Sequence, residues 1–279
     1  MSLLSTPTPD APVTETVHKT IIFDHVSIAF DENVVLDDVS FELTRGETKM
    51  LLGVLGSGKS TILKMVIGLM RPDRGDIYLL GHHVNALKEE ELFDLRRQVG
   101  MVFQESALFD SLTVRENVAY RLIEEAVDPT EIEQRVREAL RFVELEHTIG
   151  QFPSELSGGM RRRVAIARAI ISHPEVLLYD SPTAGLDPVT STTIIELLVK
   201  QRDVYHTSAL MVTHRLPDCF TMASHYFDEQ ENKMKPIPLG SHIQAPSSFL
   251  MLRDGKIIFD GSVHDLVNSP DEYIREYIA

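Results

Sequence analysis

Residues 53–60, with the sequence GVLGSGKS, decide the fold of this 279-residue chain. They fit the pattern G-x-x-x-x-G-K-[ST] and lie between a predicted strand, 47–53, and a predicted helix, 59–70, the context in which this pattern binds phosphate. Glycines let backbone N–H groups turn inward around phosphate oxygens, and the helix N-terminus adds free donors. In such a loop Lys59 neutralises the β- and γ-phosphates, and the Ser60 hydroxyl is a ligand of Mg²⁺. A glycine-rich turn without a chemical role is the alternative, and both flanking elements argue against it.

A second apolar strand, 176–180, ends in Asp180. A carboxylate at the end of a buried strand can lie beside a phosphate loop and hold Mg²⁺. Many buried strands end in Asp, so it is the combination with the loop that predicts a metal site. The residues that we expect to contact the nucleotide from the loop are Gly53, Gly56, Ser57, Gly58, Lys59, Ser60 and Thr61.

Apolar runs on both sides of the loop predict an α/β fold. Between residues 105 and 173 the strand pattern gives way to a helical one, and Thr113 with Glu116 predicts a capping box. Strands that alternate with helices favour a mainly parallel sheet that is covered on both faces. The predicted strands are 20–29, 34–43, 47–53, 99–103, 176–179, 209–213 and 249–252.

The composition excludes several classes of protein. Lys and Arg number 27 and Asp and Glu number 42, so the net charge of −15 argues against a nucleic-acid partner. The single cysteine, Cys219, cannot form an internal disulfide. No stretch has the roughly 18 uncharged apolar residues of a membrane-spanning helix, and the first 18 residues lack the basic start of a secretory signal. We therefore expect a cytoplasmic protein that reaches a membrane only through a partner.

The sequence LSGGM at 156–160, followed by RRRVAIARA at 161–169, resembles the signature motif of ABC-type ATPases. This resemblance implies a P-loop NTPase (RecA-like) core with an N-terminal antiparallel β subdomain and an inserted helical subdomain. It also implies a homodimer, in which Ser157, Gly158 and Gly159 of one subunit contact the γ-phosphate of the ATP bound to the other. We expect the three arginines 161–163 to make salt bridges across the helical subdomain.

Four further positions match the family in the order that it uses. Gln104 matches the Q-loop residue, which senses Mg²⁺ and the γ-phosphate. The run 184–187 matches the D-loop and ends in Asp187, His214 matches the switch histidine, and Phe30 lies where the family places an aromatic ring against adenine. The resemblance thus implies ATP and Mg²⁺ as ligands, with metal ligands Ser60, Gln104 and Asp180 and a catalytic set of Lys59, Gln104, Ser181 and His214.

The resemblance covers residues 20–262 and implies a division of the chain into parts. We expect a flexible tail at 1–19, the ATPase core at 20–104 and 164–262, and the helical subdomain at 105–163. A polar, proline-containing insertion at 228–248 is either a surface loop or a contact with a neighbouring subunit. At 263–279 we expect a C-terminal helical tail whose helix is capped by Ser269 and Pro270.

One departure from the family concerns catalysis. After the metal-binding Asp the family normally has Glu, which activates the attacking water, whereas here Asp180 is followed by Ser181. A serine hydroxyl is a poor base near neutral pH, and loss of a positioned base lowers rates by about 10²–10⁴-fold. Three explanations stay open: His214 and the substrate phosphate suffice for slow turnover, Glu105 substitutes, or the chain acts chiefly as an ATP-dependent clamp. We favour a working but slow ATPase.

The stretch 103–118 and the methionine of LSGGM are similar to ATPases of Mla/Mce-type lipid transporters. That resemblance implies phospholipid or other hydrophobic cargo, a pair of membrane permease subunits, a substrate-binding Mce-type protein and a small regulatory subunit, with the ATPase peripheral on the inner face of the inner membrane. The apolar residues Ala107, Leu108, Phe109 and Leu112 either contact the permease or form a buried helix start. Alternatives are a hydrolysis-impaired regulatory subunit, an importer of small solutes, and a soluble ABC ATPase of DNA repair or translation.

Overall fold

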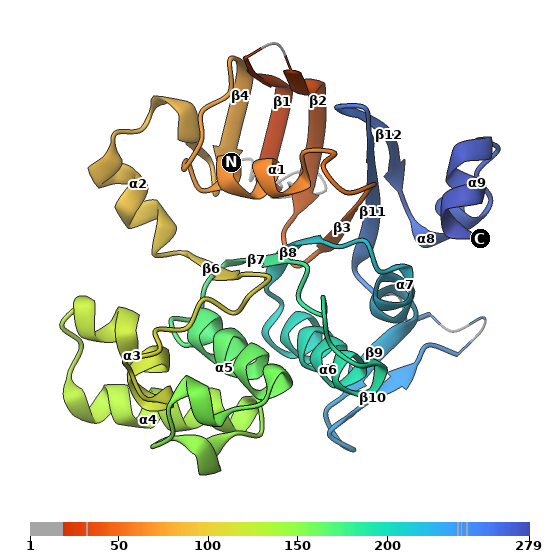
Figure 1. Ribbon diagram of the computed structural model, residues 1–279. Coiled ribbons are helices and arrows are strands. Elements are labelled where there is room, and N and C mark those ends of the chain that lie inside the picture. The colour runs from red at the N-terminus through yellow and green to blue at the C-terminus, as the bar shows by residue number, and fades with distance from the viewer. Residues whose placement is uncertain (1–18, 32, 239, 241, 244) are drawn as a thin grey trace, which may run out of the picture.

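The computed structural model describes residues 19–31, 33–238, 240, 242, 243 and 245–279 (Figure 1), so the tail expected at 1–19 lies outside the described residues except for Lys19. The centre of the fold is a six-stranded sheet in the order β12-β11-β3-β8-β7-β6. Its first five strands along the chain are mutually parallel, and β12 is antiparallel to β11. The strands are β3 (Thr48–Leu52), β6 (Val99–Val102), β7 (Val176–Asp180), β8 (Ser208–Val212), β11 (Ser247–Arg253) and β12 (Lys256–Gly261).

Both faces of this sheet are covered, because successive side chains of its strands point to opposite sides. In β3, Met50 and Leu52 belong to a buried cluster with helices α5 (Gly158–Ile170) and α6 (Pro188–Tyr205). Leu51, between them, belongs to a second cluster with helix α1 (Lys59–Val66). All five residues of β3 are buried, as expected for a central parallel strand. The predicted α/β fold with a covered parallel sheet is confirmed.

A second, antiparallel sheet lies beyond α1 (Figure 1). Its order is β2-β1-β4-β5. β1 (Lys19–Phe30) and β2 (Asn33–Thr44), which contain the predicted strands 20–29 and 34–43, pair antiparallel, and the sheet is completed by β4 (Arg74–Leu79) and the short β5 (His82–His83). Ile21 and Phe23 of β1 are among the side chains that bury its inner face. This is the N-terminal β subdomain that the family resemblance implies.

A helical lobe stands apart from both sheets (Figure 1). It contains α3 (Val114–Glu124) and α4 (Pro129–Phe142), the 3-10 turns η2 (Glu146–Thr148) and η3 (Pro153–Glu155), and the start of α5. Thr113 and Glu116 form the predicted capping box of α3, and Asp128 caps α4. The remaining helices are α2 (Glu89–Arg96), α7 (Leu216–Ser224), α8 (Val263–Val267) and α9 (Glu272–Ile278), with the 3-10 turn η1 (Val84–Ala86). None of the described helices is long and apolar enough to cross a membrane.

Three local expectations differ from the structure. Helix α1 ends at Val66 rather than at Met70, because Gly68 has a φ of 67° and its N–H bonds back to the carbonyl oxygen of Met65. The cap of α9 is Asp271, whose carboxylate accepts from the N–H of Ile274, and not Ser269 with Pro270. Part of the polar insertion is ordered as a hairpin of β9 (His225–Asp228) and β10 (Lys233–Pro236), which packs on α6.

Candidate nucleotide-binding site

The phosphate-binding loop connects β3 to α1 with a backbone that requires glycine. Gly56 and Gly58 have φ angles of 79° and 97°, in the left-handed region that favours glycine. The Nζ atom of Lys59 donates to the carbonyl oxygens of Gly53 at 2.9 Å and Val54 at 2.7 Å, and to Ser57 Oγ at 3.2 Å. Burial lowers the pKa of Lys59, and the negative charge of Asp180 partly opposes this shift. The ammonium group therefore lies over the loop, at the position where phosphate oxygens would replace the three protein acceptors.

The other predicted polar residues extend from the same edge of the central sheet. In parallel strands the carboxyl ends meet at one edge, where α/β proteins bind ligands. Asp180 is the last residue of β7, Gln104 follows β6 by two residues and His214 follows β8 by two. The side chains of Gln104 and His214 are exposed. The structure therefore brings the predicted residues of these loops to the edge that also carries Lys59.

The donor set suits Mg²⁺. Ser60 offers a hydroxyl oxygen, Asp180 a carboxylate and Gln104 an amide oxygen, and hard oxygen atoms are the ligands that Mg²⁺ prefers. Within the described part of the chain, no group of three or more His, Cys, Asp or Glu side chains could hold a metal ion by itself. Mg²⁺ is rarely held by a cage of protein ligands alone, so phosphate oxygens and water would complete its coordination here.

Ser181 takes the place of the usual glutamate in an unusual conformation. Its φ is 47°, its residue surface is 7% exposed, and its N–H donates to the carbonyl oxygen of Val212 at 2.8 Å. The hydroxyl lies 3.5 Å from Asp180 Oδ1, the long end of the hydrogen-bond range. Ser181 can therefore orient a water molecule beside Asp180, but it supplies no carboxylate to accept the proton.

The signature segment caps α5 through Ser157. Ser157 Oγ accepts from the N–H of Met160 at 3.2 Å, and both Ser157 and Gly158 are exposed. Gly159 is in close contact with α6, because an added Cβ would lie 2.4 Å from Cγ2 of Thr190. No hydrogen bond in the described structure joins 157–159 to the loop 53–60 of the same chain. This exposed helix terminus is accessible to an anion held by another molecule, which its free N–H groups would favour.

Asp187 and Phe30, the other two predicted nucleotide contacts, have these surroundings in the isolated chain. The carboxylate of Asp187 accepts from the N–H of Thr190 at 3.0 Å and from its hydroxyl at 2.5 Å, so it caps α6 within its own chain. These bonds lower the pKa of Asp187. Phe30 is 44% exposed at the end of β1. Strand β2, which pairs with β1, contacts the loop, because a Cβ on Gly58 would lie 3.0 Å from Cγ1 of Val35.

The three signature-helix arginines do not behave as expected. None of them is within 4.0 Å of a carboxylate in the described structure, so the prediction of salt bridges is wrong. Each donates to backbone carbonyl oxygens instead: Arg161 to Leu156 at 2.7 Å, Arg163 to Val143 at 3.1 Å, and Arg162 to three residues of the site. Three consecutive arginines give no sign in the sequence that Arg162, and not its neighbours, reaches the nucleotide edge.

An apolar groove lies between β6 and α3. Phe103, Phe109 and Tyr120 are each at least 40% exposed there, and the rings of Phe109 and Tyr120 are 4.7 Å apart. Of the apolar residues expected either on this surface or in a buried helix start, Ala107 and Phe109 are exposed and line the groove, whereas Leu108 packs against the core. Ala107 and Phe109 are thus accessible on the surface, and Leu108 is not.

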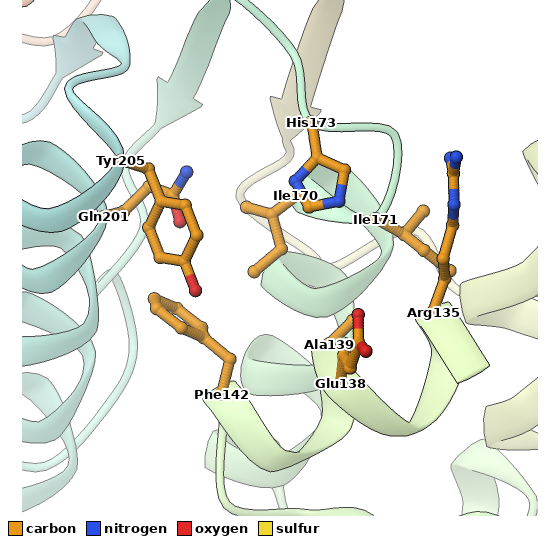
Figure 2. Close-up of a pocket in the computed structure, with 9 residues that line it drawn as sticks. All are labelled: Arg135, Glu138, Ala139, Phe142, Ile170, Ile171, His173, Gln201 and Tyr205. Atoms are coloured by element: carbon orange, nitrogen blue, oxygen red, sulfur yellow. The ribbon is translucent and has the colours of Figure 1, made fainter.

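A separate cavity lies where the helical lobe meets α6, and it contains none of the predicted site residues (Figure 2). The rings of Phe142 and Tyr205 meet edge to face at one end, with centroids 5.7 Å apart, and Arg135 lies at the other end (Figure 2). It is lined by Arg135, Glu138, Ala139, Phe142, Ile170, Ile171, His173, Gln201 and Tyr205. The cavity is a feature of the joint between the two lobes and not of the nucleotide edge.

Comparison with known proteins gives a consistent result. The sequence profile of the ABC transporter family matches residues 36–184. The chloroplastic protein TRIGALACTOSYLDIACYLGLYCEROL 3 of Arabidopsis thaliana is 36% identical over 258 residues, which are 89% of this chain and 70% of that protein. The methionine import ATP-binding protein MetN of Rhizobium meliloti is 41% identical over 202 residues, 70% of this chain but only 56% of MetN. Among solved structures, the dimeric ATP-binding cassette MJ0796 with ADP and Pi has a TM-score of 0.72 at 29% identity, covering 87% of this chain and 98% of that one.

Proposed function

The chain belongs to the ABC transporter family of ATPases, and on that premise we propose that it hydrolyses ATP as one half of a homodimer that drives a lipid-transporting membrane permease. The exposed signature segment carries this proposal. Ser157 and Gly158 are exposed at a helix N-terminus, and no hydrogen bond in the described structure ties them to the chain's own phosphate loop. A nucleotide on that loop therefore needs a second copy to complete its site.

The geometry assigns a task to each part of the site. Lys59 leaves its three loop acceptors to bind the β- and γ-phosphate oxygens, and the loop N–H groups surround the same oxygens. Ser60, Asp180 and Gln104 would hold Mg²⁺, which when bound neutralises charge on the phosphates. The exposed ring of Phe30 stacks on the adenine. His214 contacts the γ-phosphate from the end of β8.

Hydrolysis proceeds without a carboxylate at position 181. The hydroxyl of Ser181 orients the attacking water beside Asp180, and the proton leaves to substrate phosphate or to His214 rather than to a glutamate. We expect a rate about 10²–10⁴-fold lower than with a positioned base. A slow, ATP-dependent cycle of dimer closing and opening follows.

An ATP-gated subunit that does not hydrolyse is the second candidate, and Ser181 is the observation that favours it. Steady-state phosphate release from the purified complex, compared with a Lys59→Ala variant, separates the two. Turnover that depends on Lys59 supports the ATPase. Equal rates for the two proteins contradict the ATPase and support the ATP-gated subunit that does not hydrolyse.

The groove of Phe103, Ala107, Phe109 and Tyr120 is the proposed contact with the permease. Apolar and aromatic side chains at the edge of a site are typical of protein interfaces. Through it the chain is held at the inner face of the membrane, together with the regulatory and Mce-type partners that the Mla/Mce resemblance implies.

The cargo is proposed from similarity. The relative named after the lipid trigalactosyldiacylglycerol aligns over 89% of this chain, and methionine import proteins align over 70% (Rhizobium meliloti) and 93% (Bifidobacterium longum), so the extent of alignment does not separate the two cargoes. The stretch 103–118 agrees with the lipid alternative. Lipid analysis of the complex purified from its own membrane tests this: bound phospholipid above the level in a mock purification supports it, and ATP turnover that responds to a small polar solute supports an importer.

A further inference from the structure

Arg162 lies where three segments of the site meet. Its Nη1 atom donates to the carbonyl oxygens of Phe103 at 3.1 Å and Ser181 at 3.3 Å, and its Nη2 atom donates to the carbonyl oxygen of Gln104. Only 5% of the residue is exposed. One side chain of the signature helix is thus bonded both to the Q-loop segment (residues 103–107) and to the residue that replaces the glutamate.

The guanidinium group of Arg162 is held almost entirely by backbone. Its Nε atom has no hydrogen-bond partner in the described structure, and no described carboxylate is within 4.0 Å. Burial lowers the pKa of Arg162, and the charge of Asp180 opposes this from a greater distance. A buried donor that loses its acceptor is unfavourable, so the guanidinium fixes its three carbonyl oxygens relative to one another.

A second arginine of the same helix fixes the rest of the Q-loop segment. Arg168 donates to the carbonyl oxygens of Ala107 at 2.7 Å and Ser106 at 2.8 Å. Ser106 and Ala107 both have left-handed backbones, with φ of 65° and 46°, a conformation that costs a non-glycine residue free energy unless its surroundings hold it. The Q-loop segment is therefore carried by α5, and of these two arginines only Arg162 also reaches the end of β7.

We propose that Arg162 is a positioning residue for hydrolysis, coupling the place of the Q-loop segment to that of Asp180 and Ser181. The proposal rests on the proposed ATPase function. A displacement of the segment, such as a partner in the adjacent groove would cause, moves the carbonyl oxygens of Phe103 and Gln104. Arg162 transmits this movement to the carbonyl of Ser181, and so to the side chains that hold the metal and the water. Arg162 acts through backbone and does not touch the nucleotide.

Two substitutions test this in the full-length protein. Arg162→Gln keeps a neutral donor on a shorter side chain. Arg162→Lys keeps the charge, but a single ammonium lacks the planar fork that reaches acceptors on two segments at once. Arg163→Gln is the matched control, because the neighbouring arginine donates to one carbonyl, that of Val143, inside the helical lobe. The measurements are kcat for phosphate release and the Kd for ATP by direct titration.

We expect both Arg162 variants to lower kcat about ten- to a hundredfold while the Kd for ATP changes less than about twofold, as for a misplaced catalytic group. Arg163→Gln should change neither. A wild-type kcat in Arg162→Lys overturns the proposal, and so does a loss of ATP binding in parallel with kcat, which indicates general destabilisation.

A double-mutant cycle with Ser181→Glu asks whether Arg162 acts on position 181. The gain in kcat from Ser181→Glu should be at least about threefold smaller when residue 162 is Gln, because contacting groups are not additive. Equal gains in both backgrounds overturn the proposal. If wild-type turnover equals that of Lys59→Ala, the proposed function fails, and this outcome is distinct from Lys59-dependent turnover that Arg162 does not affect.

Discussion

The hydroxyl of Tyr277, in the last turn of α9, is bonded to both backbone polar groups of Gly53, the first residue of the phosphate-binding loop. Gly53 N–H donates to it at 3.3 Å, and it donates to the carbonyl oxygen of Gly53 at 3.3 Å. That carbonyl also accepts from Lys59 at 2.9 Å. Helix α9 is held in place by Ile274, which is 1% exposed. The C-terminal helix therefore supports the loop from the side opposite to the helical lobe (Figure 1).

Replacing Tyr277 by Phe is expected to weaken ATP binding. The variant keeps the ring but leaves the N–H of Gly53 without this partner and removes a second hydrogen bond to its carbonyl oxygen. A loss of about 0.5–1.5 kcal/mol in the free energy of ATP binding raises the Kd for ATP roughly two- to tenfold. Titration with ATP measures this, and Tyr273→Phe is the control, because the ring of Tyr273, which lies against the Arg253 guanidinium, is retained. Equal Kd values for the two variants would show that the hydroxyl of Tyr277 does not support the loop.

Ser181→Glu is expected to raise the turnover of ATP at least about tenfold, because a carboxylate beside Asp180 can take the proton of the attacking water. Ser181→Ala, which removes the hydroxyl without adding a base, should not raise it. Phosphate release at saturating ATP measures both. An unchanged or lower rate in Ser181→Glu means that the water is managed by other groups, with His214 as the next residue to substitute.

Asp218 makes stability depend on pH in the opposite sense from a carboxylate whose native pKa is lowered. Burial raises its pKa, while the hydroxyl of Thr183 and the charges of Arg215 and His214 lower it less. The native state then binds a proton more readily than the unfolded state, whose pKa is the ordinary 3.8. This contribution to stability is complete below pH 3.8 and is lost as the pH rises through the higher native pKa.

Asp218→Asn removes that titration. The free energy of unfolding of the wild type relative to the variant should therefore fall as the pH rises from about 4 toward 7. Urea denaturation at several pH values measures it. A difference that grows with pH would mean that the ion pair with Arg215, at 3.3 Å, outweighs burial and that the native pKa is lowered instead.

The parts of the fold with local signals were predictable from the sequence. The apolar runs of β3, β7 and β8 and the capping box at Thr113 each lie within a few adjacent residues. β4 and β12 were missed because their burial is incomplete: β4 has two buried residues out of six and β12 has none. Their pairing partners, β1 and β11, are what make them strands.

Much of the nucleotide edge was predictable for the same reason, since its loop and strand ends are short motifs. The supporting contacts were not, because they join residues far apart in sequence. Arg162 reaches Gln104 across 58 positions and Tyr277 reaches Gly53 across 224. Asn117 is fully buried, yet its amide bonds to the carbonyl oxygens of Phe109, Leu112 and Thr113 shape the segment beside the groove. A single Asn in a helical pattern carries no sign of this.

The contact of Gly159 with Thr190 gives the last prediction. Alanine is a better helix former than glycine by about 1 kcal/mol, so without a clash Gly159→Ala would be neutral or stabilising. Here the added Cβ would lie 2.4 Å from Cγ2 of Thr190, whose hydroxyl is bonded to Asp187 at 2.5 Å and resists rotation. We expect a net loss of about 1–3 kcal/mol in the free energy of unfolding.

Two variants control for this loss. Gly158→Ala meets no atom closer than 3.8 Å and should unfold like the wild type. Thr190→Ser removes the clashing methyl group and keeps the hydroxyl that bonds to Asp187, so the double variant Gly159→Ala with Thr190→Ser should recover most of the lost stability. Chemical denaturation of the wild type, Gly159→Ala, Thr190→Ser and the double variant measures this cycle, with Gly158→Ala denatured alongside. If the double variant is no more stable than Gly159→Ala alone, the requirement for glycine comes from the backbone of the signature segment and not from its packing against α6.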